Sequence, residues 1–119
     1  VGRPNDEFLI IVLEYIDGLP LNCLVARQPL PEVVTKVVMH DVLLALARLH
    51  EQGIIHRDIK SGNVIISPFG ACYVCDFGVS SSLSERRRTM AGTLLYMAPE
   101  LLFASIEGSD PYDCKVDIW

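Results

Sequence analysis

The chain has 119 residues, a formal net charge of −5 and an isoelectric point near 5.0. That length allows one domain at most, and the mild acidity argues against a nucleic-acid-binding protein, which usually carries a strongly basic face. Hydrophobic residues make up 50% of the chain and the mean hydropathy is +0.34, as in folded rather than disordered chains.

The first half of the chain predicts one strand and one long helix. Residues 8–14 (FLIIVLE) are typical of a buried strand, and residues 15–18 follow as a turn-like connector. A helix is expected from Pro31 to about residue 52, because proline suits the first turn and Gly53 suits the position just past the end. Its apolar face, at spacings of three and four residues, consists of Val34, Val38, Val42, Ala45 and Leu49.

The middle of the chain predicts short strands. A strand is expected at residues 54–55, followed by a polar loop and a second strand at residues 64–67. Residues 68–70 (PFG) are typical of a hairpin turn, after which residues 72–75 return as the partner strand.

The last third of the chain is dominated by loops. Residues 78–93 are polar, rich in serine and arginine, and predict a long surface loop, which is usually functional or mobile. A short helix is expected from residue 100 to about residue 105, then a loop at residues 108–112. Residues 116–119 should begin a further element.

Neither a membrane segment nor a metal site at the cysteines is expected. The longest apolar run, residues 8–13, is far too short to span a bilayer, and no signal peptide is visible. Cys72 and Cys75 form a C-x-x-C motif, but on a strand two residues three apart point to opposite faces. We therefore interpret the cysteines as reduced thiols of an intracellular, cytoplasmic protein.

Four short motifs follow one another in the second half of the chain. They are HRDIKSGN at residues 56–63, DFG at 76–78, APE at 98–100 and DIW at 117–119. In this order and spacing the chain resembles the catalytic domain of eukaryotic protein kinases. The resemblance implies part of an α+β protein-kinase-like fold, with the end of the small lobe and the hinge at residues 8–20 and an incomplete large lobe at residues 21–119.

The residue types of these motifs suit phosphoryl transfer from ATP to a hydroxyl group. The resemblance implies that Asp58 accepts the proton of the substrate hydroxyl and that Lys60 lies beside the γ-phosphate. Asn63 and Asp76 carry hard oxygen ligands of the kind that Mg²⁺ prefers. ATP and Mg²⁺ are therefore the expected cofactors, and Asp58, Lys60 and Asn63 the expected catalytic residues.

Two features resemble kinases that phosphorylate serine or threonine side chains of proteins. One is Lys60, two positions after the aspartate, and the other is residues 92–100 (GTLLYMAPE), which resemble the substrate-binding segment of such kinases. By this resemblance the Thr93 hydroxyl bridges Asp58 and Lys60.

The same resemblance places an adenine site near the predicted hinge. Leu13 would be the gatekeeper, while the backbone carbonyl of Glu14 and the backbone amide of Ile16 would hydrogen-bond adenine. The side chains that would border the nucleotide are Leu21, Ile65, Cys75 and Asp76. An electrophile directed to this site should label the Cys75 thiol.

Arg57 beside the catalytic aspartate implies regulation by phosphorylation. An arginine there can pair with a phosphate on the activation loop, and Thr89 is the best candidate acceptor for an upstream activating kinase. The run at residues 89–93 (TMAGT) resembles the sterile group of kinases, which includes p21-activated and MAP-kinase-cascade members.

A second interpretation is a pseudokinase or truncated relative that acts as a binding scaffold. The glycine-rich loop and the strand lysine that phosphoryl transfer requires do not occur in these 119 residues, so we expect this chain alone to be inactive. The presence of Asp58, Lys60, Asn63 and Asp76 favours the enzyme, since a scaffold has no chemical need for all four.

Overall fold

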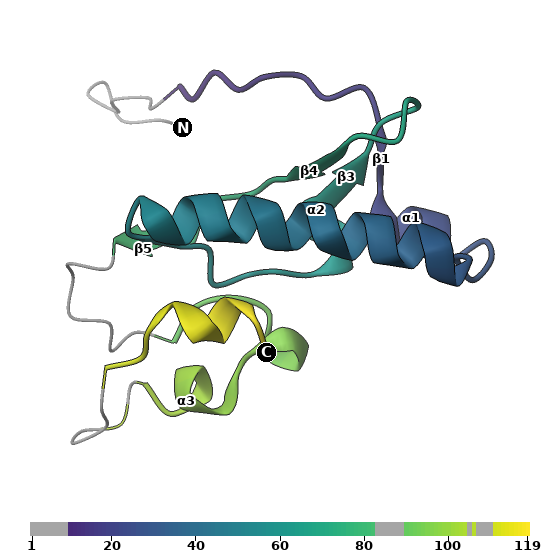
Figure 1. Cartoon of the computed structure of the whole chain (residues 1–119). Helices are drawn as coiled ribbons and strands as arrows, with labels where there is room; N and C mark the ends of the chain where they lie inside the picture. The colour runs from purple at the N-terminus through teal and green to yellow at the C-terminus, as the bar shows by residue number, and fades with distance from the viewer. Residues whose placement is uncertain (1–9, 83–89, 105, 107–110) are drawn as a thin grey trace, which may run out of the picture.

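The computed structural model describes residues 10–82, 90–104, 106 and 111–119. One long helix, α2 (Glu32–Glu51), crosses the middle of the molecule. A small sheet lies on one side of it, and the segments around α3 (Pro99–Leu102) and the C-terminus lie on the other (Figure 1). This mixture of helices and strands fits the α+β fold expected from the sequence.

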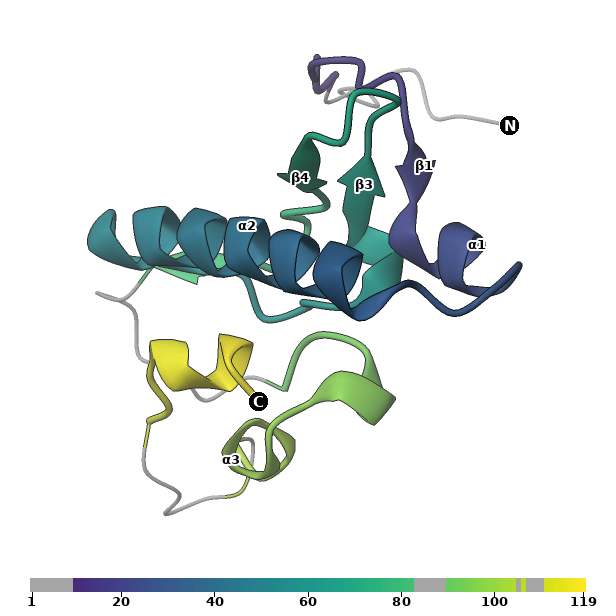
Figure 2. The ribbon, with the colours of Figure 1, turned by 45° about the vertical axis from the view of Figure 1, so that its right-hand side comes forward.

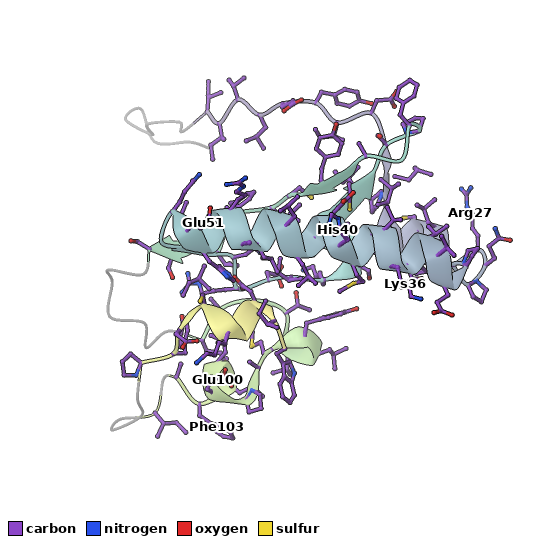
Figure 3. The ribbon with its side chains drawn as sticks, in the orientation of Figure 1. Arg27, Lys36, His40, Glu51, Glu100 and Phe103 are labelled. Atoms are coloured by element: carbon purple, nitrogen blue, oxygen red, sulfur yellow. The ribbon has the colours of Figure 1, made fainter. Side chains whose placement is uncertain are left out.

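Helix α2 has the boundaries that its sequence predicts. Pro31 precedes its first residue, and the backbone amide of Thr35 donates to the Pro31 carbonyl at 3.0 Å. Gly53 follows directly after Gln52, the C-terminal cap. The side chains of Lys36 and Glu51 project from α2 into solvent (Figure 3). The opposite face packs in a cluster of buried side chains: Val38, Val42, Leu46 and Val64.

The main sheet has three antiparallel strands in the order β1-β3-β4. Strand β1 (Leu19–Pro20) pairs with β3 (Val64–Ile66), which pairs with β4 (Cys72–Val74) through the predicted hairpin. The turn is closed by the backbone amide of Ser67, which donates to Ala71 at 2.9 Å. Figure 2 shows this sheet standing against α2, with its three strands side by side.

A second core lies on the other side of α2. Strand β2 (Ile54–Ile55) pairs with β5 (Ser81–Ser82) and buries Ile55 completely. The side chains that pack with Ile55 are Met97, Ala98, Leu101, Ala104, Tyr112 and Val116. Residues 56–63 run between the two cores, so both of them position this polar loop.

The strand predicted at residues 8–14 is wrong over the part that the structure describes. Residues 10–17 have no regular structure, and Ile10, Val12 and Leu13 are 81%, 90% and 80% exposed. A strand needs a neighbour that accepts and donates its backbone hydrogen bonds, and no described strand pairs with this segment.

Several smaller elements differ from the sequence prediction. The five-residue helix α1 (Leu21–Val25), and β5 within the predicted loop, were not expected. Helix α3 ends earlier than predicted, at Leu102, and the last element is a 3-10 helix at Cys114–Asp117. Tertiary contacts decide the ends of elements as short as these.

No helix in the described part of the chain is long and apolar enough to cross a membrane. The four cysteines, all within the described ranges, are free thiols.

Candidate active site

The backbone of the polar loop at residues 56–63 is held by a buried carboxylate from the C-terminal end of the chain. Asp117 accepts hydrogen bonds from the backbone amides of His56 at 2.9 Å and Arg57 at 2.7 Å. Its side chain is fully buried, and His50 on α2 donates a third bond to it from Nε2 at 2.8 Å. Hydrogen bonds to a buried carboxylate are stronger than neutral ones, so Asp117 fixes the loop at its start.

Two residues of the site have a left-handed backbone conformation that is uncommon for side chains other than glycine. They are Arg57, with φ of 68°, and Asp76, with φ of 66°. Each such conformation costs about 1–2 kcal/mol and persists only where the surrounding contacts require it. The bond from the Arg57 amide to Asp117 is one such contact.

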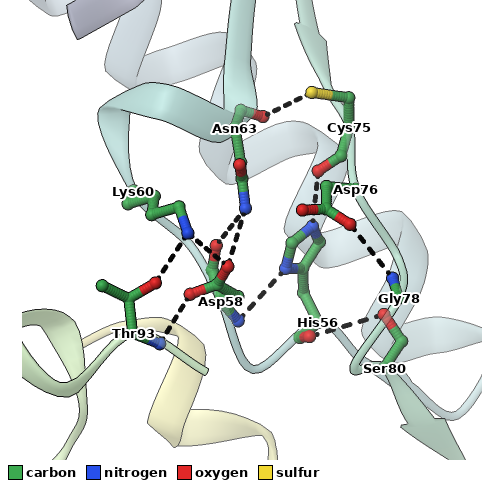
Figure 4. A network of polar contacts seen from close by, with 9 residues as sticks. All are labelled: His56, Asp58, Lys60, Asn63, Cys75, Asp76, Gly78, Ser80 and Thr93. Atoms are coloured by element: carbon green, nitrogen blue, oxygen red, sulfur yellow. Dashed lines mark hydrogen bonds and ion pairs between the residues drawn. The ribbon is translucent and has the colours of Figure 1, made fainter. Parts of the chain in front are cut away.

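The Lys60 ammonium lies between two side chains, those of Asp58 and Thr93 (Figure 4). The Nζ of Lys60 donates to the Asp58 carboxylate at 2.6 Å and to the Thr93 hydroxyl at 2.6 Å. The backbone amide of Thr93 donates to the other oxygen of Asp58 at 2.8 Å. Thr93 therefore contacts Lys60 through its hydroxyl and Asp58 through its backbone amide, whereas the family resemblance implied that the hydroxyl bridges both residues.

Gly92 allows Thr93 to approach the loop this closely. It has φ of 113°, and a Cβ atom built on it would lie 2.2 Å from the backbone oxygen of Arg57. No side chain fits in that space. The glycine was part of a motif in the sequence, but its steric role becomes visible only once the two segments are in contact.

The charge of Asp58 is set by opposing effects. Burial raises the pKa of its carboxyl group, but hydrogen bonds from Lys60 and Thr93, together with the positive charge of Lys60, outweigh burial. The pKa therefore lies below its usual value, and the carboxylate stays ionised at neutral pH. An ionised carboxylate can accept a proton from a hydroxyl group that lies within hydrogen-bonding distance.

Asn63 and Asp76 provide oxygen atoms suited to a magnesium ion. The buried Asn63 donates from Nδ2 to Asp58, to its backbone oxygen at 2.9 Å and to its carboxylate at 3.0 Å. Among the described residues, both of these side-chain contacts use the amide nitrogen, and the amide oxygen could bind a metal ion. Asp76 is exposed and accepts one hydrogen bond, from the Gly78 amide at 3.3 Å. The side chains of Asn63 and Asp76 both offer hard oxygen ligands, so this pair fits the Mg²⁺ expected from the sequence.

His56 connects the loop to the segment that carries Asp76. Its Nε2 donates to the backbone oxygen of Cys75 at 3.1 Å, and its ring lies 5.0 Å from that of Phe77. The backbone amide of Cys75 in turn donates to Asn63 at 2.9 Å. These contacts hold the two expected magnesium ligands in neighbouring segments.

The Cys75 thiol is half-buried and donates to the Asn63 backbone oxygen at 3.4 Å. Burial and the negative charge of Asp76 raise its pKa. The thiol is therefore largely protonated at neutral pH, and its intrinsic reactivity is low.

The structure brings together the expected catalytic residues more closely than the expected adenine residues. Glu14 and Ile16 line a recess against the turn between β3 and β4, but Leu13 does not and is 80% exposed. Leu21 packs against the core of α2, and Ile65 pairs with Pro20 across the sheet.

Arg57 is engaged on both sides of its guanidinium group. Its Nε donates to the backbone oxygen of Val79, and Nη1 donates to the Tyr112 hydroxyl at 2.9 Å. Sequence reasoning missed Tyr112 because nothing in a loop tyrosine indicates a partner 55 residues away. Thr89, the expected phosphate acceptor, lies outside the described residues.

Comparison with known proteins agrees with this geometry. The chain matches the model of the protein kinase domain over residues 3–119. It is 40% identical over 97% of its length to the serine/threonine-protein kinase KIC1 of Saccharomyces cerevisiae, and 42% identical over 97% to the serine/threonine-protein kinase TAO3 of Xenopus laevis. It is also 37% identical over its whole length to the mitogen-activated protein kinase kinase kinase bck1 of Aspergillus fumigatus.

The chain spans only a small part of these relatives: 11% of KIC1, 13% of TAO3 and 8% of bck1. The name of bck1 fits the expected resemblance to kinases of MAP-kinase cascades. A family match over nearly every residue, together with the Asp58, Lys60 and Thr93 contacts, leads to one conclusion: this chain belongs to the protein kinase family.

Proposed function

We propose that this chain is part of the catalytic domain of an ATP-dependent protein serine/threonine kinase that acts in intracellular signalling. The observation that carries the proposal is the position of the Lys60 ammonium, 2.6 Å from both the Asp58 carboxylate and the Thr93 hydroxyl. A cation and an ionised carboxylate held this way suit transfer of a phosphoryl group to a hydroxyl.

In the proposed reaction, the hydroxyl oxygen of a substrate serine or threonine forms a bond to the γ-phosphorus of ATP, and ADP leaves. Asp58 accepts the hydroxyl proton, since its lowered pKa keeps it ionised at neutral pH. Lys60 stabilises the negative charge of the phosphoryl group. Asn63 and Asp76 would hold Mg²⁺, which neutralises phosphate charge when bound.

We further propose that residues 8–20 are the end of a small lobe and the hinge, and that residues 21–119 are part of a large lobe. Leu13, Glu14, Ile16, Leu21, Ile65, Cys75 and Asp76 would border ATP. The free thiols of all four cysteines support a reducing compartment such as the cytoplasm.

Regulation would act through Arg57. We propose that an upstream kinase phosphorylates Thr89 and that the phosphate pairs with the guanidinium of Arg57. Arg57 already contacts Val79 and Tyr112. A phosphate paired with Arg57 would therefore order the segments that contain these two residues.

The test uses the purified full-length protein that contains this chain. It is incubated with Mg²⁺, radiolabelled ATP and peptide pools that carry serine, threonine or tyrosine acceptors. Transfer should occur to serine and threonine, and Asp58→Asn should lower kcat by about 10²–10⁴-fold. Asp113→Asn, which removes a half-exposed carboxylate, is the matched control. If the wild-type protein binds partners but transfers no phosphate, the scaffold interpretation replaces the enzyme.

A further inference from the structure

Tyr112 is a buried residue whose hydroxyl group reaches the polar loop at residues 56–63. It is 3% exposed and belongs to the second core, the cluster of side chains around α3. Figures 1 and 2 show residues 111–119, in yellow, between α2 and α3. The Tyr112 hydroxyl accepts a hydrogen bond from Nη1 of Arg57 at 2.9 Å. A tyrosine anchored in the second core therefore contacts the residue that directly precedes Asp58.

The guanidinium group of Arg57 is held by neutral oxygen atoms. Besides its bond to Tyr112, it donates from Nε to the backbone oxygen of Val79. Among the described residues, no acidic side chain forms an ion pair with it. Loss of an acceptor would leave a partly buried, charged donor unsatisfied. Two acceptors on different segments therefore fix the direction of this guanidinium group.

The bond to Val79 connects the guanidinium group to the segment that carries Asp76. Val79 lies three residues after Asp76, and Asp76 and Gly78 are exposed, so burial does not hold this segment in place. Hydrogen bonds from the loop at residues 56–63 do so instead. The Arg57 side chain makes one of them, and the Ser80 hydroxyl donates another to the backbone oxygen of His56 at 3.4 Å.

We propose that Tyr112 is a positioning residue for phosphoryl transfer and that it acts through Arg57. Its hydroxyl group orients the guanidinium of Arg57, which in turn holds residues 76–80 against the loop that carries Asp58. The arrangement of Asp58 and Asp76 thereby depends on the second core. The effect on rate rests on the proposed function, whereas the effect on residues 76–80 can be measured without phosphoryl transfer.

Hydrogen exchange of backbone amides, followed by mass spectrometry, tests the contact in the full-length protein. Tyr112→Phe removes the hydroxyl group and keeps the ring. The amides of residues 77–82 should exchange about tenfold faster, a change of about 1.4 kcal/mol that one hydrogen bond to a charged group can supply. Exchange at residues 97–104 should stay unchanged, because the ring still packs there. The protein is treated with phosphatase first, since in the proposed function a phosphate on Thr89 also pairs with Arg57.

A double-mutant cycle tests whether Tyr112 acts through Arg57. Tyr112→Phe should lower kcat about tenfold, and Arg57→Met should lower it at least as much. Combining the two should give the same kcat and the same exchange as Arg57→Met alone. Tyr73→Phe is the matched control, because it removes the hydroxyl group of a tyrosine on β4 that is 38% exposed, and it should change neither measurement.

The outcomes separate a positioning role from a structural one. Faster exchange throughout residues 97–104 would mean that Tyr112 only stabilises the second core, and would overturn the proposal. Additive effects in the cycle, or unchanged exchange at residues 77–82 in Tyr112→Phe, would overturn it as well. Faster exchange there with an unchanged kcat would refute the positioning role and leave the proposed function intact. If the wild-type protein transfers no phosphate, the proposed function fails, while the exchange data still test the contact.

Discussion

Replacing Gly92 by alanine should separate Thr93 from the catalytic loop. The added Cβ would lie 2.2 Å from the Arg57 backbone oxygen, whereas real contacts of this kind are essentially never shorter than 3.0 Å. The two backbones must therefore move apart by about 0.8 Å. The φ of 113° is also unfavourable for alanine, at a cost of about 1–3 kcal/mol.

A displacement of this size acts directly on the proposed chemistry. It lengthens the 2.8 Å bond from the Thr93 amide to Asp58 and the 2.6 Å bond from Lys60 to the Thr93 hydroxyl. Since a misplacement of about 1 Å can lower a rate by about 10²-fold, we expect kcat of the full-length Gly92→Ala protein to fall by about that factor. The KM for ATP should change much less.

Gly70→Ala is the matched control for backbone strain. Gly70 also has a positive φ, of 83°, but a Cβ built there meets nothing within 4 Å. It should lower stability by about 1 kcal/mol and leave kcat unchanged. Steady-state phosphorylation assays and thermal unfolding of both variants distinguish the clash from the strain. If Gly92→Ala retains a kcat within threefold of Gly70→Ala, the proposed role of the close contact is wrong.

Three further predictions follow from the site. Because the folded-state pKa of Asp58 is lowered, its ionised form stabilises the protein above the unfolded pKa, and this stability is lost as pH falls through the folded pKa. Lys60→Met should move that loss to higher pH in acid-unfolding curves. Iodoacetamide should modify half-buried Cys75 more slowly than exposed Cys23 in peptide mapping at pH 7, with the Cys75 rate rising as pH rises. Asp117→Asn should lower stability by about 2–3 kcal/mol in urea unfolding, because it weakens charge-assisted bonds to buried amides.

The parts of the fold that local sequence patterns control could be predicted. Helix α2 has its own proline start, glycine end and apolar stripe, so its bounds follow from about 20 consecutive residues. The β3–β4 hairpin is likewise contained in its own turn and two strands. The family could be predicted as well, because its motifs are short and contiguous.

The strand expected at residues 8–14 fails for a different physical reason. Its side chains have the hydrophobic pattern of a buried strand, yet Ile11 and Leu13 are 70% and 80% exposed. An apolar run specifies that a segment will be buried only if another segment supplies hydrogen bonds and a surface to cover it. Within the described residues no segment supplies either of these to residues 10–14, so the apolar pattern alone does not produce a strand there.

The candidate site lies between these two cases. Residues 56–63 contain the recognisable motif, but their geometry depends on contacts with residues far along the chain: Asp117 at a separation of 60 residues from Arg57, and Thr93 at 35 from Asp58. The motif therefore indicates which chemistry is possible, while the segments after residue 90 decide whether Asp58 and Lys60 are aligned for it. A substitution in those segments, such as Gly92→Ala, can disable the site without changing any residue that touches the phosphate or the acceptor hydroxyl.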